Sequence, residues 1–170
     1  GCEWVSTNSI VGVGYTSSTN FPKVAGAAVH DNTINGARDI VAAGLSTDGR
    51  LIFATYIGGS GNDDGRGLVC DASGNINIVG SSASADFPTA GAYQSTNAGS
   101  IDAVVLRLNS SGASLPYSSS VGGTGDDLLN GGDGTDSLKV RGDDGPATCD
   151  VTFSGGNGND RLSNSGVGHV

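Results

Sequence analysis

The chain has 170 residues, enough for one domain or two small ones with a modest hydrophobic core. Its net charge is −9 at pH 7 and lysine occurs only at positions 23 and 139, so it lacks the basic clusters that bind nucleic-acid phosphates. No apolar run approaches the roughly 18–20 residues of a membrane-spanning helix. Glycine occurs 30 times and helix-favouring residues are scarce, which predicts an all-β fold with many tight turns.

Four β-strands are predicted in the first half of the chain. Residues 51–57 are rich in β-branched and aromatic side chains, and residues 75–80 alternate isoleucine with asparagine. The other two predicted strands are residues 38–45 and 67–70, each followed by a turn signal. We expect the Ser/Ala/Gly-rich segment from 81 to about 100 to wrap the outside. Four strands and one long connection predict a small antiparallel sheet of the kind that forms a propeller blade.

The sequence also contains an internal duplication with a period of about 65 residues. Residues 10–14 and Phe21-Pro22 return as residues 76–80 and Phe87-Pro88. Asp39, Leu45 and Gly49 return as Asp102, Leu108 and Gly112, and residues 58–63 return as 122–127. Because these sets recur in the same order, we interpret them as two copies of one structural unit, the second incomplete.

Three nonapeptides of the form Gly-Gly-x-Gly-x-Asp-x-Leu-x occupy residues 122–130, 131–139 and 155–163. Glycine lets the backbone turn tightly, and aspartate adds hard oxygen ligands of the type that Ca²⁺ prefers. The predicted calcium ligands are Gly122, Thr124, Asp127, Gly131, Asp133, Asp136, Gly155, Asn157 and Asp160. The third copy is out of phase with the second, and residues 140–148 match poorly, so we expect one or two complete sites. A flexible Gly/Asp-rich loop is the alternative interpretation.

Residues 58–63 share the first six positions of the nonapeptide but lack its leucine. Here a structural interpretation is favoured: a turn between strands, with Asp63 or Asp64 capping backbone amides. The equivalent loop that begins at Gly122 would then both end a blade and begin the calcium-binding segment.

Residues 53–64, 71–76 and 86–88 together resemble the bacterial β-propeller repeat of large secreted and surface proteins, over about residues 4–127. The nonapeptides resemble the RTX, or haemolysin-type, calcium-binding repeats, over about residues 122–163. The first resemblance implies blades stacked side by side in an extracellular bacterial protein. The second implies a parallel β-roll that holds Ca²⁺. We therefore expect a propeller-type region, residues 1–121, and a short β-roll-like region, residues 122–170.

No catalytic motif is recognisable, and His30 and His169 are expected to be solvated rather than catalytic. Cys2, Cys70 and Cys149 form no Cys-x-x-Cys pattern, which disfavours a zinc or redox site. One disulfide with one remaining thiol, or three unpaired thiols, are both compatible with the sequence.

The chain holds fewer than two full copies of the repeat, whereas propellers close with 4–8 blades. Unpaired strand edges would invite other chains to pair with them. The sequence therefore predicts a secreted, non-enzymatic, calcium-stabilised structural or surface-matrix protein that assembles with itself. The alternatives are a carbohydrate- or cell-binding adhesin module and an accessory fragment of a larger secreted hydrolase.

Overall fold

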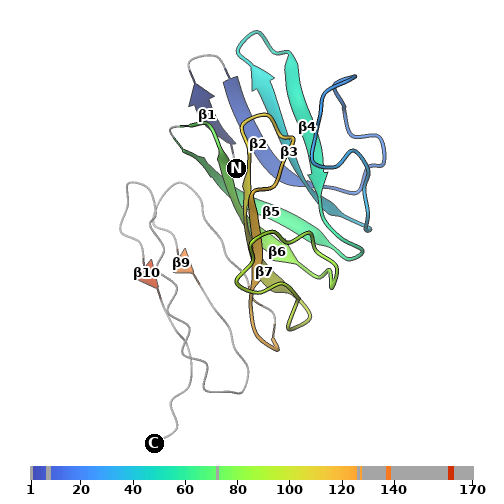
Figure 1. Cartoon of the computed structure of the whole chain (residues 1–170), viewed down its shortest axis with the longest axis vertical. Coiled ribbons are helices and arrows are strands. Elements are labelled where there is room, and N and C mark those ends of the chain that lie inside the picture. The colour runs from blue at the N-terminus through green and yellow to red at the C-terminus, as the bar shows by residue number, and fades with distance from the viewer. Residues whose placement is uncertain are drawn as a thin grey trace, which may run out of the picture.

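The computed structural model describes residues 2–6, 9–71, 73–125, 127, 137–138 and 161–162, with the backbone alone at 2–6, 137–138 and 161–162. The described chain is entirely β-structure and turns, as the composition predicts (Figure 1). Within these residues no helix is long and apolar enough to cross a membrane.

Eight strands form two antiparallel sheets of four, each strand hydrogen-bonded to its neighbour in the sequence. The first sheet, here called blade 1, contains β1 (Cys2–Ser6), β2 (Ser9–Thr16), β3 (Asp39–Ser46) and β4 (Leu51–Ile57). The second, blade 2, contains β5 (Asp63–Cys70), β6 (Ile76–Ser82), β7 (Asp102–Leu108) and β8 (Tyr117–Val121). The predicted propeller-blade-like architecture is therefore confirmed, with sheets that do not close into a ring.

The duplication is a duplication of blades, with β2, β3 and β4 of blade 1 equivalent to β6, β7 and β8 of blade 2. In each blade the second and third strands are joined by a long connection, residues 17–38 or 83–101. The predicted grouping of strands is corrected: residues 38–45 and 51–57 close blade 1, whereas 67–70 and 75–80 open blade 2. A sequence period states the length of a repeat but not the strand at which one sheet ends and the next begins.

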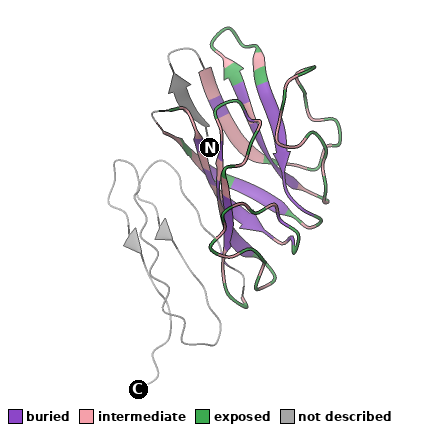
Figure 2. Ribbon diagram, viewed as in Figure 1, coloured by how far each residue is buried: buried purple, intermediate pink, exposed green. Residues whose placement is uncertain are grey.

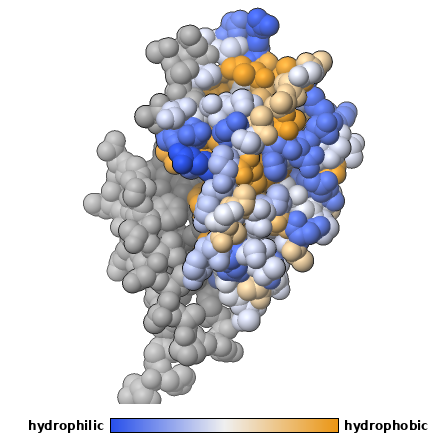
Figure 3. Space-filling model, viewed as in Figure 1, coloured by the Kyte–Doolittle hydropathy of each residue, from blue (hydrophilic) through white to orange (hydrophobic). Residues whose placement is uncertain are grey.

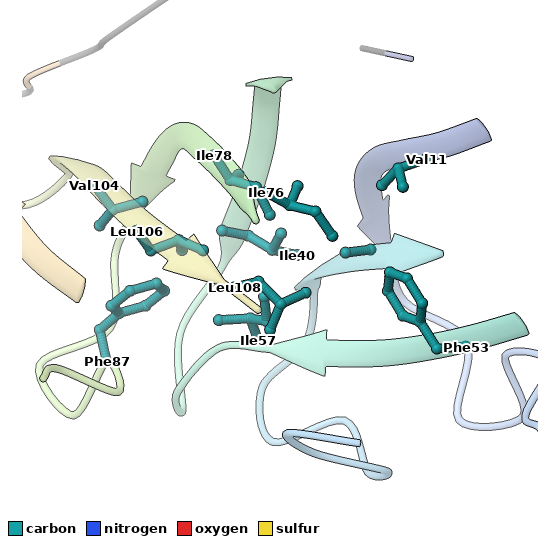
Figure 4. Close-up of a cluster of buried hydrophobic side chains, with 11 residues drawn as sticks. Val11, Ile40, Phe53, Ile57, Ile76, Ile78, Phe87, Val104, Leu106 and Leu108 are labelled. Carbon is teal, nitrogen blue, oxygen red and sulfur yellow. The ribbon is translucent and has the colours of Figure 1, made fainter. Parts of the chain in front are cut away.

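The two blades pack face to face through side chains that alternate along each strand (Figure 4). Blade 1 contributes Val11, Ile40, Ala42, Phe53 and Ile57, and blade 2 contributes Ile76, Ile78, Phe87, Val104, Leu106 and Leu108. Each of these side chains is 5% exposed or less. Complete burial of one such large apolar side chain stabilises the fold by about 1.5–3 kcal/mol, so this interface is the main source of stability. The strands carry most of the buried residues, and the loops most of the exposed ones (Figure 2).

The last strand of each blade is covered by that blade's own long connection. The amide of Tyr56 in β4 donates to Asp31 O at 3.1 Å. In β8 the amides of Ser118 and Ser120 donate to Ala90 O at 2.9 Å and Gln94 O at 3.0 Å. These bonds occupy part of an edge that would otherwise be open to a strand from another chain.

A third, two-stranded sheet pairs β9 (Ser137–Leu138) with β10 (Arg161–Leu162). The pairing is parallel, unlike every strand pair of the two blades, and it aligns Leu138 with Leu162. These are the leucines of the second and third nonapeptides.

Candidate functional site: the Gly-Asp loops

The loop after β4 is closed by two buried carboxylates. Asp63, the first residue of β5, accepts hydrogen bonds at Oδ2 from the amide of Gly59 at 2.8 Å and from Ser84 Oγ at 2.8 Å. Asp39, the first residue of β3, accepts hydrogen bonds from the amides of Asn35 at 2.9 Å and Gly36 at 3.2 Å. The predicted amide cap at Asp63 is confirmed. The loop thus fastens β4 to the start of blade 2.

Glycine is required where the two carboxylates meet the loop. A Cβ atom added to Gly58 would lie 2.6 Å from Asp39 Cγ and 2.7 Å from Asp63 Oδ2, closer than such atoms approach in proteins. At Gly36 an added Cβ would lie 2.7 Å from Gly59 O. The conformation of the loop therefore depends on the absence of side chains at these positions, rather than on glycine's flexibility.

The loop after β8 repeats this arrangement. The amide of Gly123 donates to Asp127 Oδ2 at 2.6 Å, and the amide of Asp127 donates to Ile101 O at 2.7 Å. Asp102 at the start of β7 accepts from the amides of Ala98 at 2.9 Å and Gly99 at 3.2 Å. Residues 122–125 and 127, within the first nonapeptide, therefore repeat the arrangement seen at residues 58–61 and 63.

This arrangement bears on the predicted calcium ligands. Asp127 is 4% exposed and caps a backbone amide, while Gly122 lies against the Asp102 carboxylate and Thr124 is exposed. A Cβ atom added to Gly122 would lie 2.7 Å from Asp127 Oδ2, so these two residues are neighbours. Within the described residues no group of three or more His, Cys, Asp or Glu side chains could hold a metal ion. The remaining predicted ligands, Gly131, Asp133, Asp136, Gly155, Asn157 and Asp160, lie outside the described residues. Calcium binding therefore stays a prediction.

Burial and hydrogen bonding move the pKa values of these aspartates in opposite directions. Desolvation raises the pKa of Asp63, against hydrogen bonds from Ser82, Gly59 and Ser84. Desolvation also raises the pKa of Asp39, and the nearby Asp31 and Asp86 carboxylates raise it further. The pKa of Asp86 is lowered, chiefly because the amide and hydroxyl of Ser60 donate to it.

An ion-pair group at the start of blade 2 joins the two sheets. Arg38 precedes β3, and its Nε lies 2.6 Å from Asp64 Oδ1 in β5. Arg66 Nη2 lies 2.8 Å from Asp64 Oδ2. The guanidinium of Arg38 also stacks on the ring of Tyr15, 4.7 Å from its centroid, which places it in cation–π contact with β2.

The sequence patterns did not identify two hydroxyl side chains, on β4 and β8, that hold the backbone of the long connections by hydrogen bonds. Thr55 Oγ1 donates to Asp31 O and accepts from the amide of Asp31, both at 2.9 Å. Ser119 makes the same pair of contacts with Gln94, accepting from its amide at 3.0 Å and donating to its carbonyl at 3.3 Å. Aligning residues 53–59 with residues 117–123 pairs Thr55 with Ser119. This recurrence of a hydroxyl side chain is the sequence signal that could have identified both residues as supports of the connection.

Comparison with known proteins bears on the first of the two loops. None of the curated proteins matches the chain. One family model does match, over β4, the loop that follows it, β5 and β6. Residues 52–88 thus match the model of the SBBP family, the beta-propeller repeat, and the blade architecture found in the structure agrees with that match.

Proposed function

We propose that this protein is a secreted, non-enzymatic structural protein of the bacterial cell surface or its matrix, which assembles with copies of itself and is stabilised by calcium. The observation that carries the proposal is the presence of two equivalent blades in an array that does not close. Closed propellers have 4–8 blades, in which every blade has a neighbour on both faces. A further copy of the chain would supply such neighbours.

The polar composition of the chain favours a structural role. The described surface carries few basic side chains, and the acidic side chains of the two Gly-Asp loops accept hydrogen bonds from the backbone. Their buried carboxylates stabilise turns, rather than facing a cleft in which they could transfer protons to a substrate. This supports a function that depends on the shape and stability of the blades.

The calcium part of the proposal rests on the sequence. The second and third nonapeptides place Asp136 and Asp160 at the predicted ligand position, and a net charge of −9 favours a bound cation. The parallel pairing of β9 with β10 is the register that a β-roll would need. Calcium binding to the folded state would add stability by mass action.

Sedimentation velocity of the full chain, over a range of concentrations and with either calcium or a chelator, tests the proposal. We expect species larger than the 16.7 kDa monomer, increasing with protein concentration. Electron microscopy of the same samples would distinguish closed oligomers from filaments. A monomer at every concentration in both conditions would overturn the proposed self-assembly.

A carbohydrate- or cell-binding role is the second candidate. The observation that favours it is the exposure of the Tyr93 ring, which is 87% exposed. Exposed aromatic rings can stack on sugar rings, and Tyr93 lies on the long connection of blade 2. Binding to a glycan array that is lost in Tyr93→Ala, but retained in the neighbouring Gln94→Ala, would support this role. Silence across the array would count against it.

A further inference from the structure

The interface between the two blades joins unlike faces of two equivalent sheets. Ile40 of blade 1 points into the interface, whereas its equivalent in blade 2, Ala103, does not belong to the interface cluster. The next residue, Val104, belongs to it instead. Because successive residues of a strand point to opposite faces, blade 1 uses one face of the repeat and blade 2 uses the other. Such a head-to-tail interface can be repeated by further copies.

It follows that blade 1 presents outward the same face that blade 2 buries. On this face Ile10, Phe21, Val41 and Leu45 are equivalent to Ile76, Phe87, Val104 and Leu108. Val41 is only 7% exposed, so the open part of the face is the end that carries Leu45. Leu108 is completely buried, whereas Leu45 is 39% exposed. Added Cβ atoms at Gly12 and Gly14 on the same face would meet nothing within 4 Å. Figure 3 shows apolar residues gathered on the surface in the upper part of the molecule, where blade 1 lies.

The outward face of blade 2 corresponds in the same way to the face that blade 1 buries. Val105, Tyr117 and Val121 are equivalent to Ala42, Phe53 and Ile57, and all three are only half-buried. This face is apolar at these positions. Toward one end it carries Arg107, which forms an ion pair with Asp71.

One contact across the internal interface shows what a second copy would add. Phe53 of blade 1 lies against the turn after β7, where a Cβ atom added to Gly112 would come 2.8 Å from Phe53 Cγ. The equivalent turn of blade 1 contains Gly49, which has the same left-handed backbone conformation (φ 83°, against 75° at Gly112). An added Cβ atom at Gly49 would meet nothing within 4 Å. The turn of blade 1 therefore lacks the aromatic ring that covers the turn of blade 2.

The surface beside Gly49 is hollowed. An open hollow of about 290 Å³ is lined by Ser46, Asp48, Arg50, Leu51 and Ile52. The equivalent of Phe53 is Tyr117, which pairs with Arg107 on β7, whereas Phe53 lies on Gly44 of β3. Tyr117 is only half-buried, and its ring is distant from the connection at Gly91, where an added Cβ atom would lie 3.9 Å from Tyr117 Cδ2, so part of the ring faces outward.

We propose that copies of this chain stack head to tail, with blade 2 of one copy against blade 1 of the next and Tyr117 seated on the turn of residues 46–50. This inference rests on the proposed self-assembly and specifies its contact surfaces. Stacking through faces also agrees with the hydrogen bonds that cover β4 and β8, since these bonds restrict pairing at the outer edges.

Photo-cross-linking tests the contact directly in the full chain. Tyr117 is replaced by the photoreactive p-benzoylphenylalanine, which keeps an aromatic ring at this position, and the protein is mixed with isotopically labelled chain. We expect cross-links between labelled and unlabelled chains that map to residues 46–50. The same replacement at Tyr93, which is more exposed but lies on the connection, is the control and should give no cross-link to that turn.

Charge substitutions test the same surfaces by sedimentation. Leu45→Lys and Val121→Lys, one on each outward face, are expected to lower the association constant at least tenfold, and Tyr93→Lys is expected to leave it unchanged. A chain that is monomeric throughout would overturn both the proposed function and this inference. Oligomers whose cross-links map elsewhere, or only to residues 128–170 of the same chain, would overturn the head-to-tail contact and leave self-assembly standing.

Discussion

Asp63 and Asp127 occupy equivalent positions in the two blades and make the same hydrogen bond. The Oδ2 atom of each accepts from the amide of the second glycine in its loop, Gly59 at 2.8 Å and Gly123 at 2.6 Å. The sequence predicts a turn cap at Asp63 or Asp64 and a calcium ligand at Asp127, although the two loops are nearly identical in sequence. Their common geometry assigns a capping role to both carboxylates, whether or not calcium binds nearby.

The first prediction is that loss of either cap destabilises the blades. Asp63→Ala leaves the amide of Gly59 without its carboxylate acceptor inside the protein, which should lower the free energy of unfolding by about 1–3 kcal/mol. Asp127→Ala should act in the same direction, in calcium and in chelator alike. Urea denaturation measures both. Asp48→Ala, in the exposed turn after β3, is the matched control and should change stability by less than about 0.5 kcal/mol. Equal stability of Asp63→Ala and the control would show that the cap is dispensable.

The second prediction concerns the space at the loop glycines. Gly58→Ala would place a methyl group 2.6 Å from Asp39 Cγ, so the two carboxylates must separate and the variant should lose about 1–3 kcal/mol. Gly122→Ala should behave alike, because its added Cβ would lie 2.6 Å from Asp102 Cγ. Gly123→Ala, one residue further on, would meet nothing within 4 Å and provides the control. A Gly58→Ala protein with the melting temperature of the wild type would contradict the close packing seen here.

Much of this fold could be predicted from the sequence, because local patterns determine it. The strand β4 was predicted with its correct limits, since β-branched and aromatic residues end abruptly at two glycines. The start of β5 was placed four residues late, because a bulge between Gly65 and Gly67 interrupts the alternation that marks a strand. The role of Asp39 could not be predicted, since it accepts from Asn35 and Gly36 and meets Gly58 only once the sheet has formed.

The third prediction is a pH dependence centred on Asp63. Because the folded state raises the pKa of this carboxyl above 3.8, the folded protein holds the proton more tightly than the unfolded chain. The resulting stability is present below the unfolded pKa and is lost as the pH rises through the folded pKa. Asp31 and Asp86, whose pKa values are lowered, contribute in the opposite sense and lose stability as the pH falls.

Asp63→Asn isolates this contribution, because asparagine keeps the shape and cannot titrate. The stability of the wild type relative to Asp63→Asn should fall as the pH rises above about 4, the ordinary pKa of an aspartate, and through the raised pKa of the folded state. Urea denaturation of both proteins at several pH values measures the difference. A difference that stays constant over this range, or grows with pH, would contradict the raised pKa.

The last prediction separates calcium binding from the architecture of the blades. If the second and third nonapeptides bind calcium, the metal should raise the melting temperature of the wild type, and a concentration of 100 times Kd would add about 2.7 kcal/mol. Asp136→Asn and Asp160→Asn should each abolish most of this increase while leaving the melting temperature in chelator unchanged. Asp127→Asn should lower the melting temperature in chelator and leave the calcium-dependent increase unchanged, because the Asp127 carboxylate caps Gly123 in the closing loop of blade 2. Differential scanning calorimetry in calcium and in chelator distinguishes the two patterns.

If calcium leaves the wild-type midpoint unmoved, the nonapeptides are Gly/Asp-rich turns without a metal. If Asp127→Asn alone removes the calcium effect, the ligand role belongs to the blade loop and the capping interpretation is wrong.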